Sequence, residues 1–306
     1  MDVRFIINEQ AGEGKGLVVW KELRAHSYPH EFTCFRGHAT ELARRAAQQH
    51  TNPLLLIIIG GDGTIHEVLN GIVGCTHVTV GVVKAGSGND FARGVSTFRS
   101  LADIESYIEE TSVKRKKVDL GYVQLSDQPT LYFAGSCGFG LDAEISLAVS
   151  QSKLKKTLNK WKLGSLVYVL TVVRSLLLFK PFDATIKIGN EERVFKDCWL
   201  ITVSNQKYFG GGMKISPHSV NNDGKFELTV VHSIPVIKFL FVFLLVFTGG
   251  HTRFKGVSAY KGKKFVIDAA REVGCHTDGE YIGTTKIHQS VVCAVDLRKF
   301  FVADFD

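Results

Sequence analysis

Short apolar runs alternate with helical patterns through the first 120 residues of the chain. The apolar runs are residues 4–7, 31–35, 54–59 and 78–83, and a stretch with helical spacing follows each of them. Such alternation is typical of βαβ units that build a parallel sheet. The run 54–59, Leu-Leu-Leu-Ile-Ile-Ile, is apolar at every position, which predicts a central strand covered on both faces.

The pattern changes after the basic run 114–117 to a succession of β-rich runs, several of them separated by dipeptides typical of tight turns. We therefore expect an α/β protein with two domains. Residues 1–122 would form a parallel-sheet domain and residues 123–296 an antiparallel β-sandwich, with the tail 297–306 returning to the first domain. A chain of 306 residues is long enough for this division.

The most apolar stretch, 239–247, has nine residues, well short of the roughly 18 that span a bilayer. It predicts a buried or surface-docked helix after Pro235. The first apolar run is too short for a signal peptide, and the six cysteines are far apart and form no disulfide or zinc pattern. These features favour a cytoplasmic protein.

Basic residues give the chain a net charge of +7, and they gather in its second part. Residues 1–122 carry 14 Lys and Arg against 14 Asp and Glu, whereas residues 123–306 carry 23 against 16. The stretch 145–182 alone has seven bases and no acid. This imbalance favours an anionic partner, either a membrane leaflet or nucleic acid.

A predicted helix within that stretch carries its bases on one face and apolar residues beside them: Lys153, Lys156 and Lys160 with Leu154 and Trp161. A helix of this kind can lie on an anionic membrane surface, with Trp at the interface. The alternative is a core-facing helix with a solvated basic side. We expect no nucleic-acid binding, because no aromatic-rich basic strand or known binding module accompanies the lysines.

The central motif of the chain, Gly60-Gly61-Asp62-Gly63-Thr64, directly follows the run 54–59. Glycines let the backbone approach a ligand closely, and the N–H groups of the following helix point into the same space, which predicts a phosphate-binding loop. Asp62 beside a polyphosphate would require a divalent cation between them. Thr64 and Glu67 have the spacing of a capping box at the helix start. The alternative is a plain strand-to-helix turn.

Two further loops, 84–93 and 8–16, are rich in glycine and also follow predicted strands. Loops at the carboxyl ends of neighbouring parallel strands line one crevice, so these loops can face the same ligand. Taken alone, 8–16 is equally a flexible surface loop. Neither is a Walker A loop, since G-x-x-x-x-G-K-[ST] does not occur in the chain.

Together with other motifs in the same order, these loops resemble those of the bacterial diacylglycerol kinases and related lipid kinases. The other motifs are Asn70-Gly71, Gly138-Phe139-Gly140, the block 209–217 and Asp278-Gly279-Glu280. The resemblance runs over nearly the whole chain. It implies a nucleotide fold shared with phosphofructokinase and NAD kinase, and transfer of phosphate from ATP, with Mg²⁺, to a lipid hydroxyl.

The resemblance also implies roles for individual residues. The nucleotide site would use Asn8, Thr33, Gly60, Gly61, Asp62, Gly63, Thr64, Ile65, His66 and Ser87. A structural Mg²⁺ would be bound by Val220, Asp223 and Lys225, the outer two through backbone carbonyls. Asp62 and Glu280 would be catalytic, with Glu280 as the proton acceptor. The chain departs from the family at Glu9 and at Lys84 or Ala85, where the family has proline.

Glu280 also suits this role on chemical grounds, because phosphorylating an alcohol requires a group that takes the hydroxyl proton. Considered alone, the segment 276–280 favours a hairpin turn followed by a solvated glutamate. The resemblance reverses that preference.

We expect a lipid kinase that converts diacylglycerol to phosphatidic acid at the inner face of the membrane. The alternative among enzymes is an NAD kinase-like phosphotransferase, which shares the central loop, although the second glycine loop favours the lipid kinases. A non-catalytic nucleotide sensor at the membrane is the other alternative, and the joint presence of Asp62, Asp223 and Glu280 argues against it. The identity of the lipid and the formation of a homodimer stay open.

Overall fold

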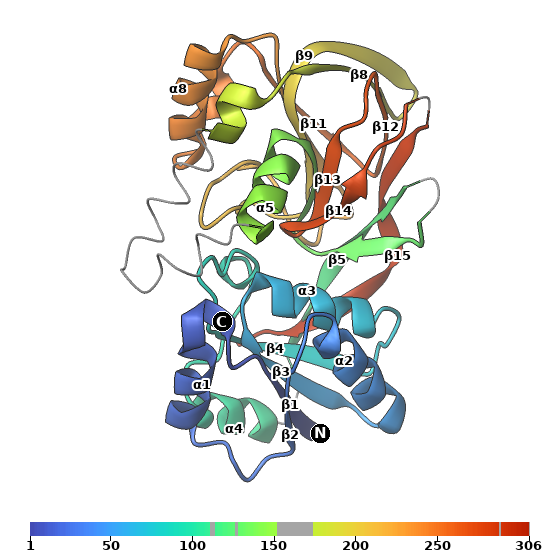
Figure 1. Ribbon diagram of the computed structural model, residues 1–306. Coiled ribbons are helices and arrows are strands. Elements are labelled where there is room, and N and C mark those ends of the chain that lie inside the picture. The colour runs from blue at the N-terminus through green and yellow to red at the C-terminus, as the bar shows by residue number, and fades with distance from the viewer. Residues whose placement is uncertain (111–113, 126–127, 152–173, 288, 306) are drawn as a thin grey trace.

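The computed structural model of the protein describes residues 1–110, 114–125, 128–151, 174–287 and 289–305. The molecule has two halves, which lie one above the other in Figure 1, with the N-terminal strands in the lower half and most later strands in the upper half. Strands of both halves join in a single hydrogen-bonded sheet of 15 strands.

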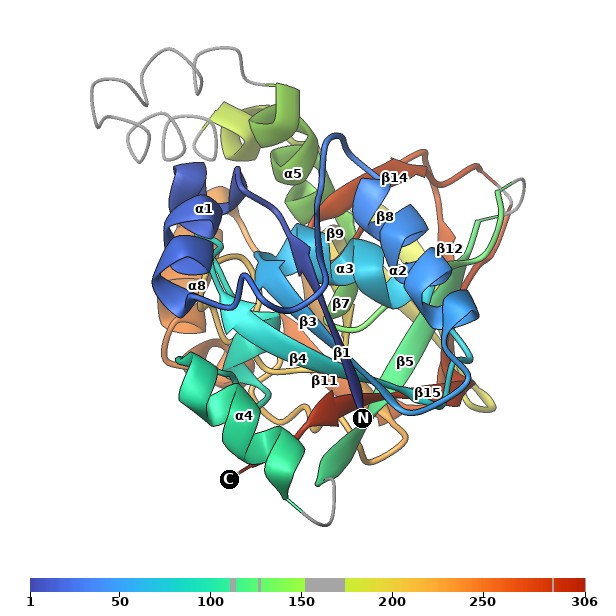
Figure 2. The ribbon, with the colours of Figure 1, turned by 90° about the horizontal axis from the view of Figure 1, so that it is seen from below.

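The lower half is a parallel sheet in the order β2-β1-β3-β4, with helices on both faces. Helices α1 and α4 cover one face, and α2 and α3 cover the other (Figure 2). The predicted α/β architecture is therefore confirmed. The elements are β1 (Asp2–Ile7), α1 (Ala11–Leu23), β2 (His30–Phe32), α2 (His38–Gln49), β3 (Leu54–Gly60), α3 (Asp62–Gly71), β4 (Val78–Lys84), the short helix η1 (Phe91–Arg93) and α4 (Leu101–Glu109).

Strand β3 is buried along its whole length, because the two helical layers cover both of its faces. Leu54, Leu56 and Ile58 pack in one cluster with Leu42 and other apolar residues of α2 and α3. The residues between them pack in another cluster with Trp20 and other apolar residues of α1 and α4. Successive side chains of a strand point to opposite faces, so every position here requires an apolar residue.

The upper half is built from antiparallel strands, as expected, and helices pack against them. Its core is one large apolar cluster that includes Phe139, Phe226 and Phe265, with a smaller cluster of Met213, Ile215 and Val246. The elements are β5 (Arg115–Gln124), β6 (Leu131–Phe133), β7 (Ser136–Gly140), α5 (Leu141–Gln151), β8 (Phe182–Ile188), β9 (Glu191–Ser204), β10 (Phe226–His232), α8 (Val236–Val246), η3 (Gly250–Arg253), β11 (Val257–Gly262), β12 (Lys264–Ala269), β13 (Gly274–Thr277), β14 (Glu280–Thr284) and β15 (Val291–Ala303).

Strand β15 runs through both halves (Figure 1). It pairs with β12 at its start and with β5 over most of its length. Near its end, Phe301 and Val302 pair in parallel with Thr79 and Val80 of β4. The lower sheet therefore gains its last strand from the C-terminal segment. The predicted boundary after residue 122 falls within β5, and the division into two domains stays a prediction.

No helix in the described part of the chain is long and apolar enough to cross a membrane. The apolar stretch 239–247 forms most of α8, a helix of 11 residues with one buried face. The predicted basic helix with Lys153, Lys156, Lys160 and Trp161 lies outside the described residues.

Candidate active site

Three glycine-rich loops meet where β1, β3 and β4 end. A Cβ atom on Gly86 would lie 2.4 Å from the Cα atom of Gly61, and one on Gly12 would lie 2.2 Å from the carbonyl oxygen of Ala85. Only glycine allows backbones to approach so closely. The loops that follow the three strands therefore form one continuous surface.

Asn8 and Thr64 connect the first of these loops to the central one. Nδ2 of Asn8 donates a hydrogen bond of 2.9 Å to Oγ1 of Thr64. Two other predicted nucleotide ligands lie at the same edge of the sheet, Thr33 at the end of β2 and Ser87 in the loop after β4. The structure thus places the predicted nucleotide residues along one sheet edge, and their role in binding stays a prediction.

Glu67 stabilises the start of α2, and the predicted capping box at the start of α3 is wrong. The Glu67 carboxylate accepts hydrogen bonds from the backbone N–H groups of Gly37 at 2.8 Å and Ala39 at 3.1 Å. The N-cap residue of α3 is Gly61, which makes no side-chain cap hydrogen bond. The first N–H groups of α3 are therefore left facing the glycine loops, an arrangement that suits phosphate.

Asp62 and Asp90 bring two carboxylates close together beside Gly88. A Cβ atom on Gly88 would lie 3.0 Å from Oδ2 of Asp62 and 3.6 Å from Oδ2 of Asp90. Oδ1 of Asp62 accepts a hydrogen bond of 2.9 Å from the N–H of Phe91. Burial raises the pKa of Asp90, and the charge of Asp62 adds to this effect. Paired carboxylates of this kind are the donors that Mg²⁺ prefers.

Asp90 also binds the upper half of the molecule to the lower half. Its carboxylate accepts hydrogen bonds from the N–H groups of Gly211 at 2.6 Å and Gly212 at 2.7 Å. These two glycines have φ angles of 89° and 105°, a backbone conformation that favours glycine. We did not single out Asp90 from the sequence, although it lies within the second glycine loop.

Asp278 holds the turn between β13 and β14 against both halves. Its carboxylate accepts hydrogen bonds from the N–H groups of Ala134 at 3.1 Å, Gly135 at 2.7 Å and Ser136 at 2.9 Å, and from Nδ1 of His66 in α3 at 2.8 Å. Burial alone would lower the pKa of His66 and raise that of Asp278. Their mutual hydrogen bond and charges outweigh burial, so the pKa of His66 is raised and that of Asp278 is lowered. These shifts favour a charged pair.

Glu280 follows this turn directly and reaches the central glycine loop. Asp278 and Gly279 have φ angles of 50° and 86°, as the predicted two-residue hairpin turn requires. Oε1 of Glu280 lies 3.1 Å from the position that a Cβ atom on Gly63 would take. Oε2 lies 2.6 Å from Nη2 of Arg36, in the loop after β2. A residue of the upper half therefore shares a site with two loops of the lower half.

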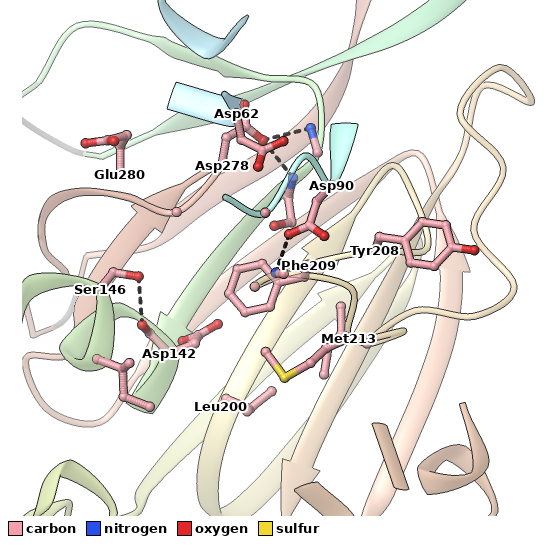
Figure 3. A pocket seen from close by; sticks show the side chains of 18 of the residues that line it. Asp62, Asp90, Asp142, Ser146, Leu200, Tyr208, Phe209, Met213, Asp278 and Glu280 are labelled. Atoms are coloured by element: carbon pink, nitrogen blue, oxygen red, sulfur yellow. Dashed lines mark hydrogen bonds between the residues drawn. The ribbon is translucent and has the colours of Figure 1, made fainter. Parts of the chain in front are cut away.

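One cavity of about 990 Å³ extends from this cluster into the upper half (Figure 3). Of the predicted site residues, Asp62, Ile65, His66 and Glu280 line it. Its charged end is lined by Arg36, Asp62, His66, Asp90, Asp278 and Glu280. Its other end is apolar, lined by residues that include Leu141, Ile145, Leu176, Leu200, Met213, Ile215, Phe239, Phe243 and Val246. This shape suits a ligand with a polar reacting end and an apolar tail.

Asp142 is a carboxylate in the wall of this cavity that the sequence did not single out as a site residue. It is buried, and its Oδ2 atom lies 3.1 Å from Nε2 of His276 and 3.2 Å from Oγ1 of Thr202. Arg36 and Asp278 were also not identified as site residues from the sequence. For Asp278 the signal was its place beside Glu280, whereas no sequence signal marked Arg36.

The predicted metal ligands lie away from the cavity, in the loop between β9 and β10. Oδ1 of Asp223 accepts a hydrogen bond of 2.9 Å from the N–H of Lys225. The N–H of Gly224 donates to Oδ2 of buried Asp119 at 2.7 Å, and Lys299 forms an ion pair with the other oxygen of Asp119. Among the described residues, no three His, Cys, Asp or Glu side chains cluster as metal ligands. The metal site therefore stays a prediction.

Comparison with known proteins finds relatives along most of the chain. The family model of the diacylglycerol kinase catalytic domain matches residues 2–123, and that of the YegS C-terminal NAD kinase beta sandwich-like domain matches residues 135–296. A Bacillus subtilis (strain 168) protein whose name describes it as a lipid kinase, YtlR, is 36% identical over 293 residues, 92% of this chain and 94% of its own. The diacylglycerol kinase of the same strain is 30% identical over 260 residues, 83% of this chain and 79% of its own.

Solved structures share the fold over nearly the full length of the chain. A crystal structure described as a diacylglycerol kinase from Bacillus anthracis str. Sterne has a TM-score of 0.73 at 23% identity, covering 99% of this chain and 97% of that chain. An NAD kinase from Archaeoglobus fulgidus in complex with ATP has a TM-score of 0.54 at 12% identity, covering 99% and 94%. These likenesses confirm the fold class, including its relation to NAD kinase.

Proposed function

Because this chain belongs to the diacylglycerol kinase family of lipid kinases, we propose that it transfers the γ-phosphoryl group of ATP to the hydroxyl group of diacylglycerol. The shape of the cavity is the observation that supports this proposal most directly. The cavity that starts at Asp62 and Glu280 continues into an apolar chamber lined by α5, α8 and the upper sheet. The product would be phosphatidic acid.

The three glycine-rich loops would hold the phosphates of the nucleotide. Their backbones approach each other within distances that only glycine permits, and the N-terminus of α3 faces them without a side-chain cap. Helix N-termini of this kind bind anions, because their first N–H groups have no partner within the helix. Asn8 and Thr64 would fix the relative position of two of these loops.

Mg²⁺ fits the charged end of the cavity by the chemistry of its donors. Asp62 and Asp90 supply carboxylate oxygens beside Gly88, and Mg²⁺ sites in kinases use one or two carboxylates together with phosphate oxygens. When bound, Mg²⁺ would reduce the negative charge of the phosphates. A separate structural Mg²⁺ at Val220, Asp223 and Lys225 would lie beside Asp119, which Lys299 already provides with a positive charge.

Glu280 would accept the proton of the lipid hydroxyl. Its carboxylate lies at Gly63 of the central loop, so an alcohol bound against Glu280 would face the nucleotide phosphates. The hydrogen bond between His66 and Asp278 fixes the turn from which Glu280 extends. A positioned base of this kind orients the hydroxyl oxygen as well as taking its proton.

The apolar end of the cavity would hold an acyl chain and distinguishes this proposal from its alternatives. A soluble dinucleotide such as NAD offers no apolar tail for the walls formed by Leu200, Met213 and Phe243. A non-catalytic sensor would have no use for Glu280 beside the glycine loop. We further propose that the enzyme acts at the inner face of the membrane, where its substrate resides.

Labelled ATP incubated with a panel of lipids and with NAD tests this function, followed by identification of the labelled product. We expect label in phosphatidic acid, dependence on Mg²⁺, and loss of activity in Asp62→Asn. Exposed Glu109→Gln on α4 is a matched control that should remain active. Labelled NADP, or label in no product, would contradict the proposal.

A further inference from the structure

Helix α8 is apolar on two opposite sides. Its sequence, Val-Ile-Lys-Phe-Leu-Phe-Val-Phe-Leu-Leu-Val, has a single polar residue, Lys238. Phe239, Val242 and Val246 are buried, and they attach the helix to the upper half. A surface helix needs only one such stripe to pack on a core. The apolar residues on its other side therefore require a separate explanation.

Those residues form a continuous surface that faces solvent. The exposed fractions are 71% for Ile237, 43% for Leu240, 61% for Phe241, 66% for Leu244 and 50% for Phe247, just after the helix. At about 3.6 residues per turn, these five side chains fall within about 120° of the helix circumference. Single exposed apolar residues are ordinary, whereas a contiguous group of large ones marks an interaction surface.

This outward face is continuous with the substrate cavity. Phe239 and Phe243 line the cavity from the inner side of α8, and Leu240 both lines the cavity and is partly exposed. Leu176 lines the same cavity, and Leu177 and Leu178, which follow it, are 69% and 67% exposed. The apolar surface outside therefore borders the apolar chamber inside.

The charged residues that flank α8 in the sequence have one sign. The chain has no Asp or Glu between Glu227 and Asp268, a range that includes α8 and η3. Lys238 on the helix, Arg253 at the end of η3 and Lys255 just after it are exposed. An apolar surface on a segment that carries bases and no acids complements the acyl chains and headgroups of an anionic bilayer.

We propose that the outward face of α8 docks the protein on an anionic lipid bilayer. Ile237, Phe241 and Leu244 enter the interfacial layer, and Lys238 contacts the headgroups. The helix is about 16 Å long, too short for a hydrocarbon core of roughly 30 Å, so it lies along the surface. The proposal rests on the proposed lipid kinase function, because docking in this way would open the cavity toward the membrane that holds the substrate.

Co-sedimentation of the full chain with phosphatidylcholine vesicles, with and without phosphatidylglycerol, tests this surface in the absence of ATP and diacylglycerol. In the triple variant Ile237→Gln, Phe241→Gln, Leu244→Gln we expect about 10²-fold weaker binding to vesicles with phosphatidylglycerol, because three large apolar side chains no longer leave water. The matched control Val18→Gln, Val194→Gln, Leu297→Gln changes exposed apolar residues on other elements and should bind like the parent.

A second variant, Lys238→Glu with Lys255→Glu, keeps the apolar face and reverses two charges. It should weaken binding to vesicles with phosphatidylglycerol and leave binding to pure phosphatidylcholine unchanged. Undiminished binding by the triple variant would overturn the proposal. So would a parent dimer that the triple variant converts to monomers, because a second copy would then cover α8.

Turnover of a short-chain, detergent-dispersed diacylglycerol separates this proposal from the proposed function. A triple variant that loses vesicle binding and keeps this turnover supports both. If neither the parent nor the variant turns over the lipid, the kinase proposal fails, and the vesicle assay alone still decides whether α8 docks. Circular dichroism confirms that the exposed substitutions leave the fold unchanged.

Discussion

Arg36 and Glu280 form an ion pair between the two halves of the molecule, with Nη2 of Arg36 2.6 Å from Oε2 of Glu280. The side chains are 72% and 41% exposed, so the pair adds little to stability. Arginine can bind a phosphate through two parallel hydrogen bonds. A nucleotide at the glycine loops would therefore compete with Glu280 for Arg36 and leave the carboxylate available to accept a proton.

Arg36→Gln should raise the KM for ATP and lower kcat, together about 10²-fold in kcat/KM, because a charge-assisted contact to phosphate is lost. Arg36→Lys should recover part of this loss, since it keeps the charge without the planar geometry. Steady-state kinetics at varied ATP measures both. Arg44→Gln, at an exposed arginine on α2, is the control. Equal activity of Arg36→Gln and Arg44→Gln would refute the role.

Glu280→Gln should lower kcat by roughly 10² to 10⁴ and keep ATP binding, because the amide preserves shape and removes basicity. Calorimetric titration with a non-hydrolysable ATP analogue measures binding separately from turnover. Exposed Glu272→Gln, on the loop before β13, is a matched control with expected parental kinetics. Equal losses of nucleotide affinity and turnover would instead assign Glu280 to binding.

His66 and Asp278 should make stability depend on pH. Because the pKa of His66 is raised in the folded state, the contribution of His66 to stability is complete below its pKa in the unfolded chain, about 6.5. This contribution is lost as pH rises through the pKa in the folded state. Because the pKa of Asp278 is lowered in the folded state, its contribution to stability is present above its pKa in the unfolded chain, about 3.9. This contribution is lost as pH falls through the pKa in the folded state. The pair therefore stabilises the folded protein most between about pH 3.9 and about pH 6.5.

Thermal unfolding of the parent and of His66→Gln at pH 5.5 and pH 9 measures this dependence. We expect a larger difference in Tm between the two proteins at about pH 5.5 than at about pH 9. In an Asp278→Asn background the effect of His66→Gln should become much less dependent on pH. A difference in Tm that is constant across this range would show that His66 contributes through packing alone.

Lys299→Met should destabilise the protein by about 3 kcal/mol, because it leaves the buried carboxylate of Asp119 without its cation. Asp119 is 2% exposed and also binds the N–H of Gly224, so it has little access to water. Urea unfolding measures the change. Lys187→Met, at an exposed position of β8, should change stability by less than about 0.5 kcal/mol. Similar values for both substitutions would exclude a structural role for the ion pair.

The elements that could be predicted from the sequence are those whose signal is local. The uniform apolar run of β3 predicts burial on both faces of the sheet. Glycines that follow successive strands predict loops at one edge of the sheet. The turn at Asp278-Gly279 requires a positive φ angle at both residues, and Asp-Gly is a dipeptide that adopts it readily. In each case the physical cause and the residues that show it are adjacent in the chain.

The features that could not be predicted from the sequence depend on contacts between residues that are distant in the chain. Glu67 has the spacing of a capping residue for its own helix, yet it binds the start of α2, about 30 residues earlier. Arg36 and Glu280 are separated by 244 residues, and no local pattern pairs them. Helix α8 is apolar on nearly every side, so periodicity alone could not tell which face is buried.

Strand β15 has a consequence for the order of assembly on the ribosome. The edge of β4 pairs with Phe301 and Val302, so the parallel sheet that contains β1 to β4 is completed by residues synthesised much later than its other strands. Until they emerge, β4 presents an unpaired edge, the feature through which nascent chains associate wrongly with one another. Pairing between such distant segments also forms slowly. A chaperone that shields β4 during translation would therefore raise the yield of folded protein more than one that acts after release.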